Sequence, residues 1–227
     1  MPAMRQIKVR LTGRSPLIMH KDNITFQERV EKYNKLPKSE KSTKDKKGDD
    51  RSPAWTWIGS LYRSGNTVGI PADNLMTMLR DGGSKVPLPG GKSNETFKKI
   101  TQSGILINEI LWEIVTNEGQ TIDPSFIDKL ELEMDFDKHL IAVQNAGFNL
   151  LVKRAKIGQN KHVRVRPIFE TGWSIEGELC IVDDKITDDF LEIILNQAGS
   201  YVGLCDWRPG SPKSPGSYGM FSVEMFV

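Results

Sequence analysis

The sequence predicts an α+β fold with one antiparallel sheet, two helices on one face of it, and inserted segments. Stretches at 5–12, 173–181 and 219–227 alternate apolar and polar residues, as half-buried strands do. Stretches at 70–82 and 187–201 carry apolar residues at helical spacing. Hydrophobic residues make up 38% of the 227 residues and charged residues 26%, which is typical of a soluble globular protein.

The first strand places Ile7, Val9 and Leu11 on one face, and Gly13 ends it. A short helix is expected over 24–36. Residues 32–51 hold eight Lys or Arg and four Asp or Glu, so we expect a mobile, solvated, Lys-rich insertion there, with a nucleic-acid contact as the alternative. Trp55 and Trp57 would share one face of an extended piece and anchor that insertion by packing, with stacking on bases as the alternative.

The next helix begins at Ile70-Pro71, because proline is favoured at the first helical position, and ends at Gly82-Gly83. Residues 104–115 are apolar on both faces and predict a central strand or two joined pieces. The pattern over 123–145 is ambiguous. Its alternation from Leu130 to Phe136 favours a strand.

The segment 138–169 contains no Asp or Glu and many cations. His162, Arg164 and Arg166 fall on one face of a strand, opposite Val163 and Val165. Cations about 7 Å apart along a strand match the repeat of a single-stranded nucleic-acid backbone. A solvated strand face is the alternative, although such faces usually mix both signs of charge.

The remaining elements complete a recognisable order. After the strand at 173–181, Thr187 is placed to cap a helix whose first turn carries Asp188 and Asp189. A strand over 219–227 follows. The order strand, helix, strand, strand, helix, strand is ferredoxin-like (RRM-like), βαββαβ. We therefore expect a single domain over 1–227, with the Lys-rich insertion at 32–51 and a basic insertion and strand at 138–169.

The run from Gly203 to Phe221 links the second helix to the final strand. Three Gly and three Pro lie between Pro209 and Gly219, so this run is neither helix nor central strand. It carries Trp207, Arg208, Lys213 and Tyr218, and cations with flat rings on a glycine-opened loop suit a phosphodiester chain. The alternative is an ordinary connection whose aromatic residues pack inward.

Composition narrows the class of protein further. The net charge is only +2, so a basic surface must arise by local segregation. Two cysteines are too few for a disulfide framework or a Cys-rich metal site, and we expect reduced thiols in the cytoplasm. No apolar run is long enough for a membrane span, the N-terminus is not a signal peptide, and we expect no metal and no cofactor.

Three motifs carry a resemblance to a known family: Thr12 to His20, the strand from Arg164 to Phe169, and Gly-Leu-x-Asp-Trp-Arg-Pro at 203–209. With the order of elements, they resemble the RAMP superfamily, and in particular the backbone-type subunits of CRISPR effector complexes and a group of bacteriophage proteins. The phage proteins run directly from Arg-Pro to Gly-Arg-Phe. This chain inserts residues 210–217 there and has Met220 in place of that arginine.

The resemblance implies an RRM-like core with inserted thumb and palm segments, and binding of single-stranded RNA along a filament. We therefore expect a single-stranded nucleic-acid-binding protein, for RNA or DNA, that oligomerises along its strand in a bacterial or phage-infected cytoplasm, with other CRISPR-like subunits as further partners. The residues expected to contact nucleic acid are Arg14, His20, Lys153, Arg154, Lys156, Lys161, Arg164, Arg166, Trp207, Arg208, Lys213 and Tyr218.

Two alternatives stay open. Some RAMP proteins are metal-independent endoribonucleases that use a histidine as general acid or base, and His20 is the candidate here, with His139 and His162 the other histidines. The second alternative is a phage module that mimics or inhibits a CRISPR complex.

Overall fold

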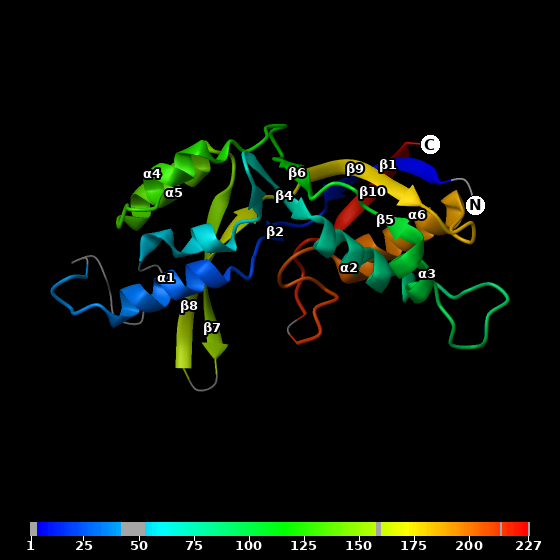
Figure 1. Ribbon diagram of the computed structural model, residues 1–227, viewed down its shortest axis with the longest axis horizontal. Coiled ribbons are helices and arrows are strands. Elements are labelled where there is room, and N and C mark those ends of the chain that lie inside the picture. The colour runs from blue at the N-terminus through cyan, green and yellow to red at the C-terminus, as the bar shows by residue number, and fades with distance from the viewer. Residues whose placement is uncertain (1–3, 42–52, 158–159, 214, 227) are drawn as a thin grey trace. The chain divides into compact units, whose positions relative to one another are not determined.

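The computed structural model describes residues 4–41, 53–157, 160–213 and 215–226, without the side chains of 154–157 and 160–162 (Figure 1). It is a mixed α/β structure with antiparallel sheets. Contacts divide the chain into two compact units. Unit 1 comprises Met1–Leu17, Gly69–Thr121 and Glu170–Val227, and unit 2 comprises Ile18–Val68 and Ile122–Phe169. The expectation of a single domain with insertions stays a prediction.

Unit 1 is built around an antiparallel sheet in the order β10-β1-β9-β6-β4. Its strands are β1 (Arg5–Gly13), β4 (Thr67–Pro71), β6 (Leu111–Val115), β9 (Ser174–Ile181) and β10 (Phe221–Phe226), and the short β5 (Ile105–Leu106) also pairs with β9. The predicted strands at 5–12, 173–181 and 219–227 are therefore confirmed. The stretch 104–115 forms the two joined pieces β5 and β6.

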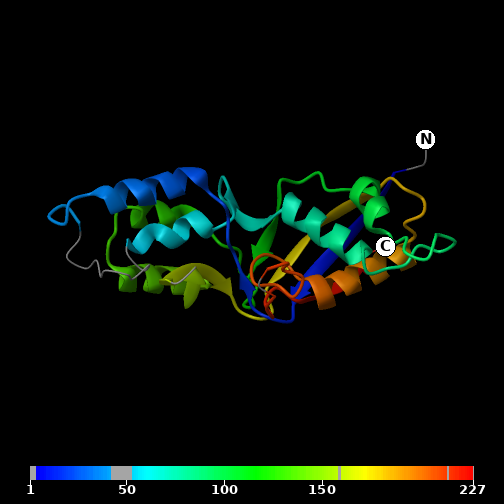
Figure 2. The same cartoon turned by 90° about the horizontal axis from the view of Figure 1, so that it is seen from below.

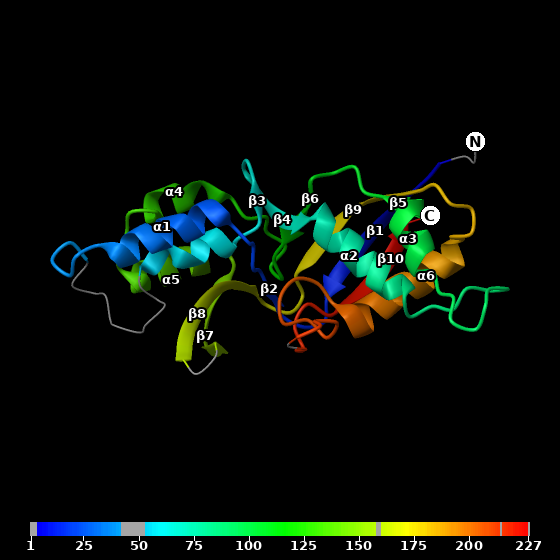
Figure 3. The same cartoon turned by 60° about the horizontal axis from the view of Figure 1, so that its bottom comes forward.

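One face of this sheet is covered by α2 (Ala72–Gly83) and α6 (Asp188–Gln197), which lie side by side in Figures 1 and 3. The helix α3 (Lys98–Gly104) packs on α2, and the π-helical turn η3 (Ala198–Val202) extends α6. Thr187 caps α6 as predicted, because its side chain accepts a bond from the N–H of Phe190. Below the helices, Trp112 lies directly over Gly177, where a Cβ atom would collide with the indole ring.

The opposite face of the sheet carries charges of both signs. Glu176 pairs with Lys8 and with Arg10, whose Nη2 lies 2.8 Å from a Glu176 oxygen. Arg10 also reaches Glu224 at 3.0 Å. The polar residues of the alternating strands thus neutralise one another on this face.

Unit 2 combines helices with a two-stranded ribbon. The ribbon pairs β7 (Asn149–Ile157) with β8 (Asn160–Phe169), and after β2 (Leu17–Ile18) the N–H of Met19 bonds to the carbonyl of Pro167. The helix α1 (Ile24–Lys35) lies beside the 3-10 helix η1 (Ala54–Ser60) in Figure 2. The remaining elements are β3 (Arg63–Ser64), η2 (Pro124–Phe126), α4 (Ile127–Leu130) and α5 (Phe136–Asn145).

Two predictions in unit 2 are wrong. The stretch from Leu130 to Phe136 is not a strand but a turn between α4 and α5, in which Leu132 is 87% exposed. The turn is favoured because the Glu133 side chain accepts bonds from Met134 and Asp135, and Asp135 then caps α5. Trp55 and Trp57 are also not extended, since both belong to η1, but both are buried. Of the Lys-rich insertion at 32–51, residues 32–35 belong to α1 and residues 42–51 lie outside the described residues.

Candidate nucleic-acid interface

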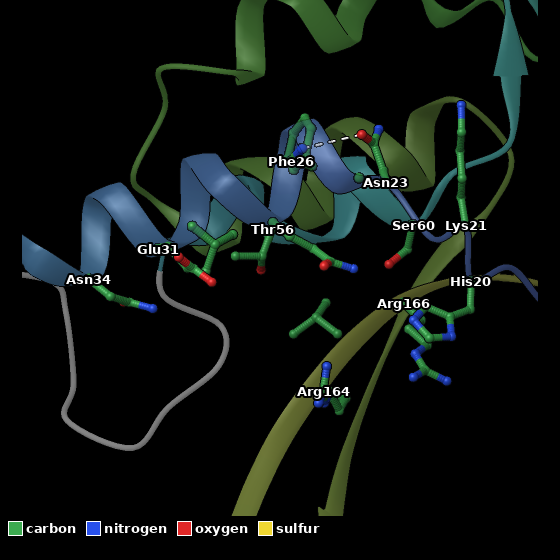
Figure 4. A pocket seen from close by; sticks show the side chains of 14 residues that line it. His20, Lys21, Asn23, Phe26, Glu31, Asn34, Thr56, Ser60, Arg164 and Arg166 are labelled. Carbon is green, nitrogen blue, oxygen red and sulfur yellow. Dashed lines mark hydrogen bonds between the residues drawn. The ribbon is translucent and has the colours of Figure 1, made fainter.

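A cavity of about 480 Å³ opens in unit 2 between α1, η1 and β8 (Figure 4). Its volume falls within the range of about 300–1,000 Å³ that is typical of small-molecule sites. It combines cations, amides, hydroxyls and an apolar floor. The lining residues are His20, Lys21, Asn23, Phe26, Gln27, Val30, Glu31, Asn34, Thr56, Gly59, Ser60, Arg164, Val165 and Arg166.

The β8 strand supplies the two guanidinium groups. Arg164 and Arg166 lie two residues apart and therefore share a strand face, as the sequence predicts. Lys153 of β7 stands directly opposite Arg164, so its side chain lies on that same face. The three residues concentrate positive charge on one face of the ribbon. This arrangement favours an anionic ligand.

Arg166 is largely buried, with 9% of its surface exposed. Burial, and then the neighbouring charge of Arg164, lower the pKa of Arg166 to about 10, while Tyr62 acts in the opposite direction. The side chain is still protonated at neutral pH. Its positive charge is therefore held in a partly dehydrated position, where an anion interacts with it more strongly than in water.

His20 follows β2 at the rim of the cavity. The hydroxyl of Tyr62 donates to the His20 carbonyl at 2.8 Å, and the N–H of Lys21 donates to the Ser60 carbonyl at 3.0 Å. The residue keeps substantial solvent exposure, yet its ring sits in the hollow beside the arginines. Loss of hydration there, then the charges of Arg166 and Arg164, lower the pKa of His20 to about 4, against the effect of Asp22. His20 is thus neutral at pH 7.

The α1 wall faces these cations. Asn23 caps α1, because its Oδ1 accepts a bond from the N–H of Phe26 at 3.2 Å. Arg29 fastens the helix by stacking 4.1 Å from the centre of the Trp55 ring and pairing with Glu131. The polar positions 23, 27, 31 and 34 then line the cavity along one face of α1. The sequence analysis missed this row, although polar residues repeating every three to four positions were its available signal.

His139, another histidine considered for catalysis, is fully buried in unit 2. Its Nδ1 accepts a bond from Trp57 Nε1–H at 3.0 Å, so its Nε2–H donates to the Glu133 carbonyl, also at 3.0 Å. Burial lowers the pKa of His139 despite the opposing effects of Glu133 and Asp135. Both ring nitrogens of His139 are therefore used in hydrogen bonds within unit 2, and His139 does not line the cavity.

The remaining predicted cations of unit 2 fall on β7 and β8. Arg154, Lys156, Lys161 and His162 belong to the part of the ribbon whose side chains lie outside the description, so their roles stay predictions.

The predicted residues of the C-terminal loop, with Arg14, belong to unit 1. Arg208 is 16% exposed at its side chain, lies 3.6 Å from Asp81 and donates to the Val202 carbonyl at 3.4 Å. Trp207 and Tyr218 lie with ring centres 6.3 Å apart, and Lys213 is exposed. Arg14 is exposed and donates to the Ser200 hydroxyl at 3.0 Å. Arg208 therefore serves as an anchor of the loop.

Backbone hydrogen bonds hold the ends of this loop in place. Gly203 has a φ of 72°, a conformation that glycine adopts without strain, and the chain turns there. The N–H of Leu204 then bonds to the Gly219 carbonyl, and the N–H of Gly219 bonds to the Pro16 carbonyl. The two ends of the loop are thereby tied together and to the end of β1.

The structure thus brings His20, Arg164 and Arg166 into one cavity, with Lys153 on the same ribbon face. Arg14, Trp207, Arg208, Lys213 and Tyr218 form a second group within unit 1. A continuous track joining the two groups stays a prediction.

Neither a metal site nor a membrane span is found in the described part of the chain. No group of three or more His, Cys, Asp or Glu side chains is placed to hold a metal ion among the described residues. Within the same residues, no helix has the length and apolar character needed to cross a bilayer. Neither protein-family models nor curated proteins gave a match to this chain.

Proposed function

We propose that this protein binds single-stranded nucleic acid and that the unit 2 cavity and the adjoining ribbon face hold its phosphates. The observation that carries the proposal is the convergence of Arg164 and Arg166 in one cavity, with Lys153 directly opposite Arg164. These three cations share one face of the ribbon and can engage neighbouring phosphates of an unpaired strand.

We further propose that unit 1 is a ferredoxin-like, RAMP-type core. In its support, the strands β1, β6, β9 and β10 follow the order β10-β1-β9-β6 with every neighbour antiparallel. Along the chain, α2 lies between β1 and β6, after the segment 18–68 of unit 2, and α6 lies between β9 and β10. Both helices cover one face of the sheet (Figure 1). That arrangement is the one expected of a βαββαβ unit.

The open face of this sheet is a poor place for the strand to bind. An RRM stacks bases on aromatic side chains of its sheet. Here the corresponding face carries the ion pairs of Lys8, Arg10, Glu176 and Glu224. Two of these four residues are acidic, so the face would repel phosphates as much as attract them. This favours the unit 2 cavity as the binding surface.

The resemblance to CRISPR backbone subunits leads us to propose side-by-side assembly of protomers along the strand, in a cytoplasmic setting. Size-exclusion chromatography with light scattering tests this. The mass per oligonucleotide should rise stepwise as the oligonucleotide is lengthened. A single protomer on every length would contradict assembly but leave strand binding intact.

Salt dependence of binding provides the principal test. Three cations, Lys153, Arg164 and Arg166, predict a slope of log affinity against log salt of about −2.1, or about an 18-fold loss between 50 and 200 mM. Fluorescence anisotropy with labelled 20-nucleotide RNA and DNA measures this slope. Arg164→Ala should reduce the slope to about −1.4. Lys129→Ala, which removes an exposed cation of α4 outside the cavity, is the matched control.

A flat salt dependence, or an equal effect of the two substitutions, would refute phosphate binding by the cavity. The melting temperature of each variant is measured in parallel, so that loss of folding is not mistaken for loss of contact. Because Arg166 is buried, Arg164 is the better position for this experiment.

One observation favours endoribonuclease activity as a second candidate. His20 is neutral at pH 7 and lies beside two guanidinium groups. A neutral imidazole can accept the proton of an RNA 2′-hydroxyl as that oxygen attacks the adjacent phosphorus, while arginines stabilise the developing charge. The bond from phosphorus to the 5′-oxygen of the next nucleotide then breaks, and the imidazolium returns the proton to that leaving oxygen. Cleavage of labelled RNA in the presence of a chelator, abolished in His20→Ala but retained in His139→Gln, would support it. Intact RNA with wild-type protein would rule it out.

A further inference from the structure

We propose, resting on the function above, that the cavity takes one whole nucleotide of the strand and that its α1 wall favours bases with an exocyclic amino group. Adenine, cytosine and guanine carry this group, whereas uracil and thymine present only carbonyl oxygens as their exocyclic polar groups. The proposal adds base selection to a site otherwise expected to bind only the backbone.

The cavity lining offers separate groups for the phosphate, the flat face and the polar edge of a nucleotide. Arg164 and Arg166 enter from β8, below the hollow in Figure 4, and suit the phosphate. Phe26, Val30 and Val165 supply apolar surface against which a base can lie. Asn23 and Glu31 lie above the hollow on α1 and suit the polar edge of the base.

Existing hydrogen bonds determine what the α1 wall offers. Gln27 Nε2 donates to Asp22 Oδ1 at 2.6 Å, and since a carboxylate can only accept, the amide must keep this orientation. Gln27 therefore presents an acceptor, Oε1, to a ligand. Asn23 Oδ1 is bound to the N–H of Phe26.

Glu31 is the residue that decides selectivity. Its carboxylate is exposed and points toward the hollow in Figure 4, and one of its oxygens lies 3.8 Å from Lys35 Nζ. A carboxylate accepts bonds from the amino groups of bases. Opposite a carbonyl oxygen of uracil or thymine, it meets a second acceptor and neither group is satisfied. The ring N3–H is the one donor on that edge of these two bases, so Glu31 and the Gln27 acceptor disfavour them relative to bases with an amino group. The Asn23 amide nitrogen, whose Oδ1 is already bound, is the one donor among these three α1-side groups.

The test compares otherwise identical oligonucleotides rich in adenine, cytosine or uracil by competition anisotropy. Wild-type protein should prefer the adenine and cytosine strands by about tenfold. Glu31→Gln should abolish this preference by strengthening uracil binding, because an amide can donate to a carbonyl oxygen. Glu28→Gln, an exposed change on the same helix outside the cavity, should retain it. The oligonucleotides differ in stiffness, but each protein variant meets the same set, so this difference cancels when the variants are compared.

The outcomes separate this inference from the proposed function. Salt-dependent binding with no base preference, or a preference that Glu31→Gln leaves unchanged, overturns base selection alone. Absence of binding to every oligonucleotide overturns the proposed function. Adenosine monophosphate should compete at least about 100-fold more weakly than the adenine strand, because it reaches fewer cations. Equal competition would assign the cavity to free nucleotides and overturn the strand-binding part.

Discussion

The buried pair of Trp57 and His139 should make unit 2 sensitive to acid. Both side chains are fully buried, and His139 Nδ1 accepts a bond from Trp57 Nε1–H at 3.0 Å. Protonation of His139 would place a hydrogen on Nδ1, and the resulting N–H would face the N–H of Trp57. The folded state therefore resists protonation of His139, in agreement with the direction in which burial moves its pKa. The unfolded chain has no such constraint.

The sign and size of the effect follow from proton linkage. A histidine whose pKa is lowered by folding contributes stability that is present above about pH 6.5, its unfolded value, and lost as the pH falls. If the ring stays neutral in the folded protein throughout, lowering the pH from 7.5 to 5.0 costs at most about 2 kcal/mol. In His139→Gln, the loss of unfolding free energy between pH 7.5 and 5.0 should be smaller by this amount.

Guanidinium unfolding followed by 19F NMR of fluorotryptophan-labelled protein is the assay, because it separates the signal of Trp57 from those of unit 1. The pKa of His20 is also lowered, so His20 would add its own pH dependence to unfolding. The proteins with His139 and with His139→Gln are therefore both compared in a His20→Gln background. Equal losses of stability between pH 7.5 and 5.0, with and without His139, would refute the reasoning.

Four further predictions concern other parts of the molecule. Gly177→Ala should destabilise unit 1 by about 2 kcal/mol or more, because its Cβ collides with Trp112, whereas Gly119→Ala meets no neighbouring atom and should cost less; equal melting temperatures would contradict this. Arg208→Ala should speed hydrogen exchange of residues 203–219 without changing the salt slope of binding, and a shallower slope would make Arg208 a phosphate contact. A bound phosphate should raise the pKa of His20 from about 4, so affinity should increase as the pH falls from 7 to 5, and His20→Asn should remove that increase. Thr187→Ala should destabilise unit 1 by about 1 kcal/mol through loss of the α6 cap, which thermal unfolding can detect.

Much of unit 1 could be predicted because its patterns are local. Ile7, Val9 and Leu11 are buried on one face of β1, as their alternation requires, and Thr187 caps α6. Local rules fail where a short pattern has two solutions. The alternation from Leu130 to Phe136 fits a strand, but the Glu133 and Asp135 side chains bond to nearby backbone N–H groups and begin α5 instead.

The candidate site could be predicted only in part. The absence of carboxylates over 138–169 drew attention to Arg164 and Arg166, and both line the cavity. The α1 wall was not predicted, because nothing in the sequence shows that residues near position 30 face residues near position 165. The pairing of Arg208 with Asp81 could not be predicted, because it joins residues that are distant in the sequence, and a phosphate contact by Arg208 stays a prediction.

The way the chain alternates between the two units bears on its synthesis. Unit 2 is complete once Phe169 has left the ribosome, whereas β1 of unit 1 must wait for both β9 and β10 before its two edges are paired. We therefore expect unit 2 to become protease-resistant first on stalled nascent chains, while the exposed edges of β1 depend on chaperones until translation reaches β10.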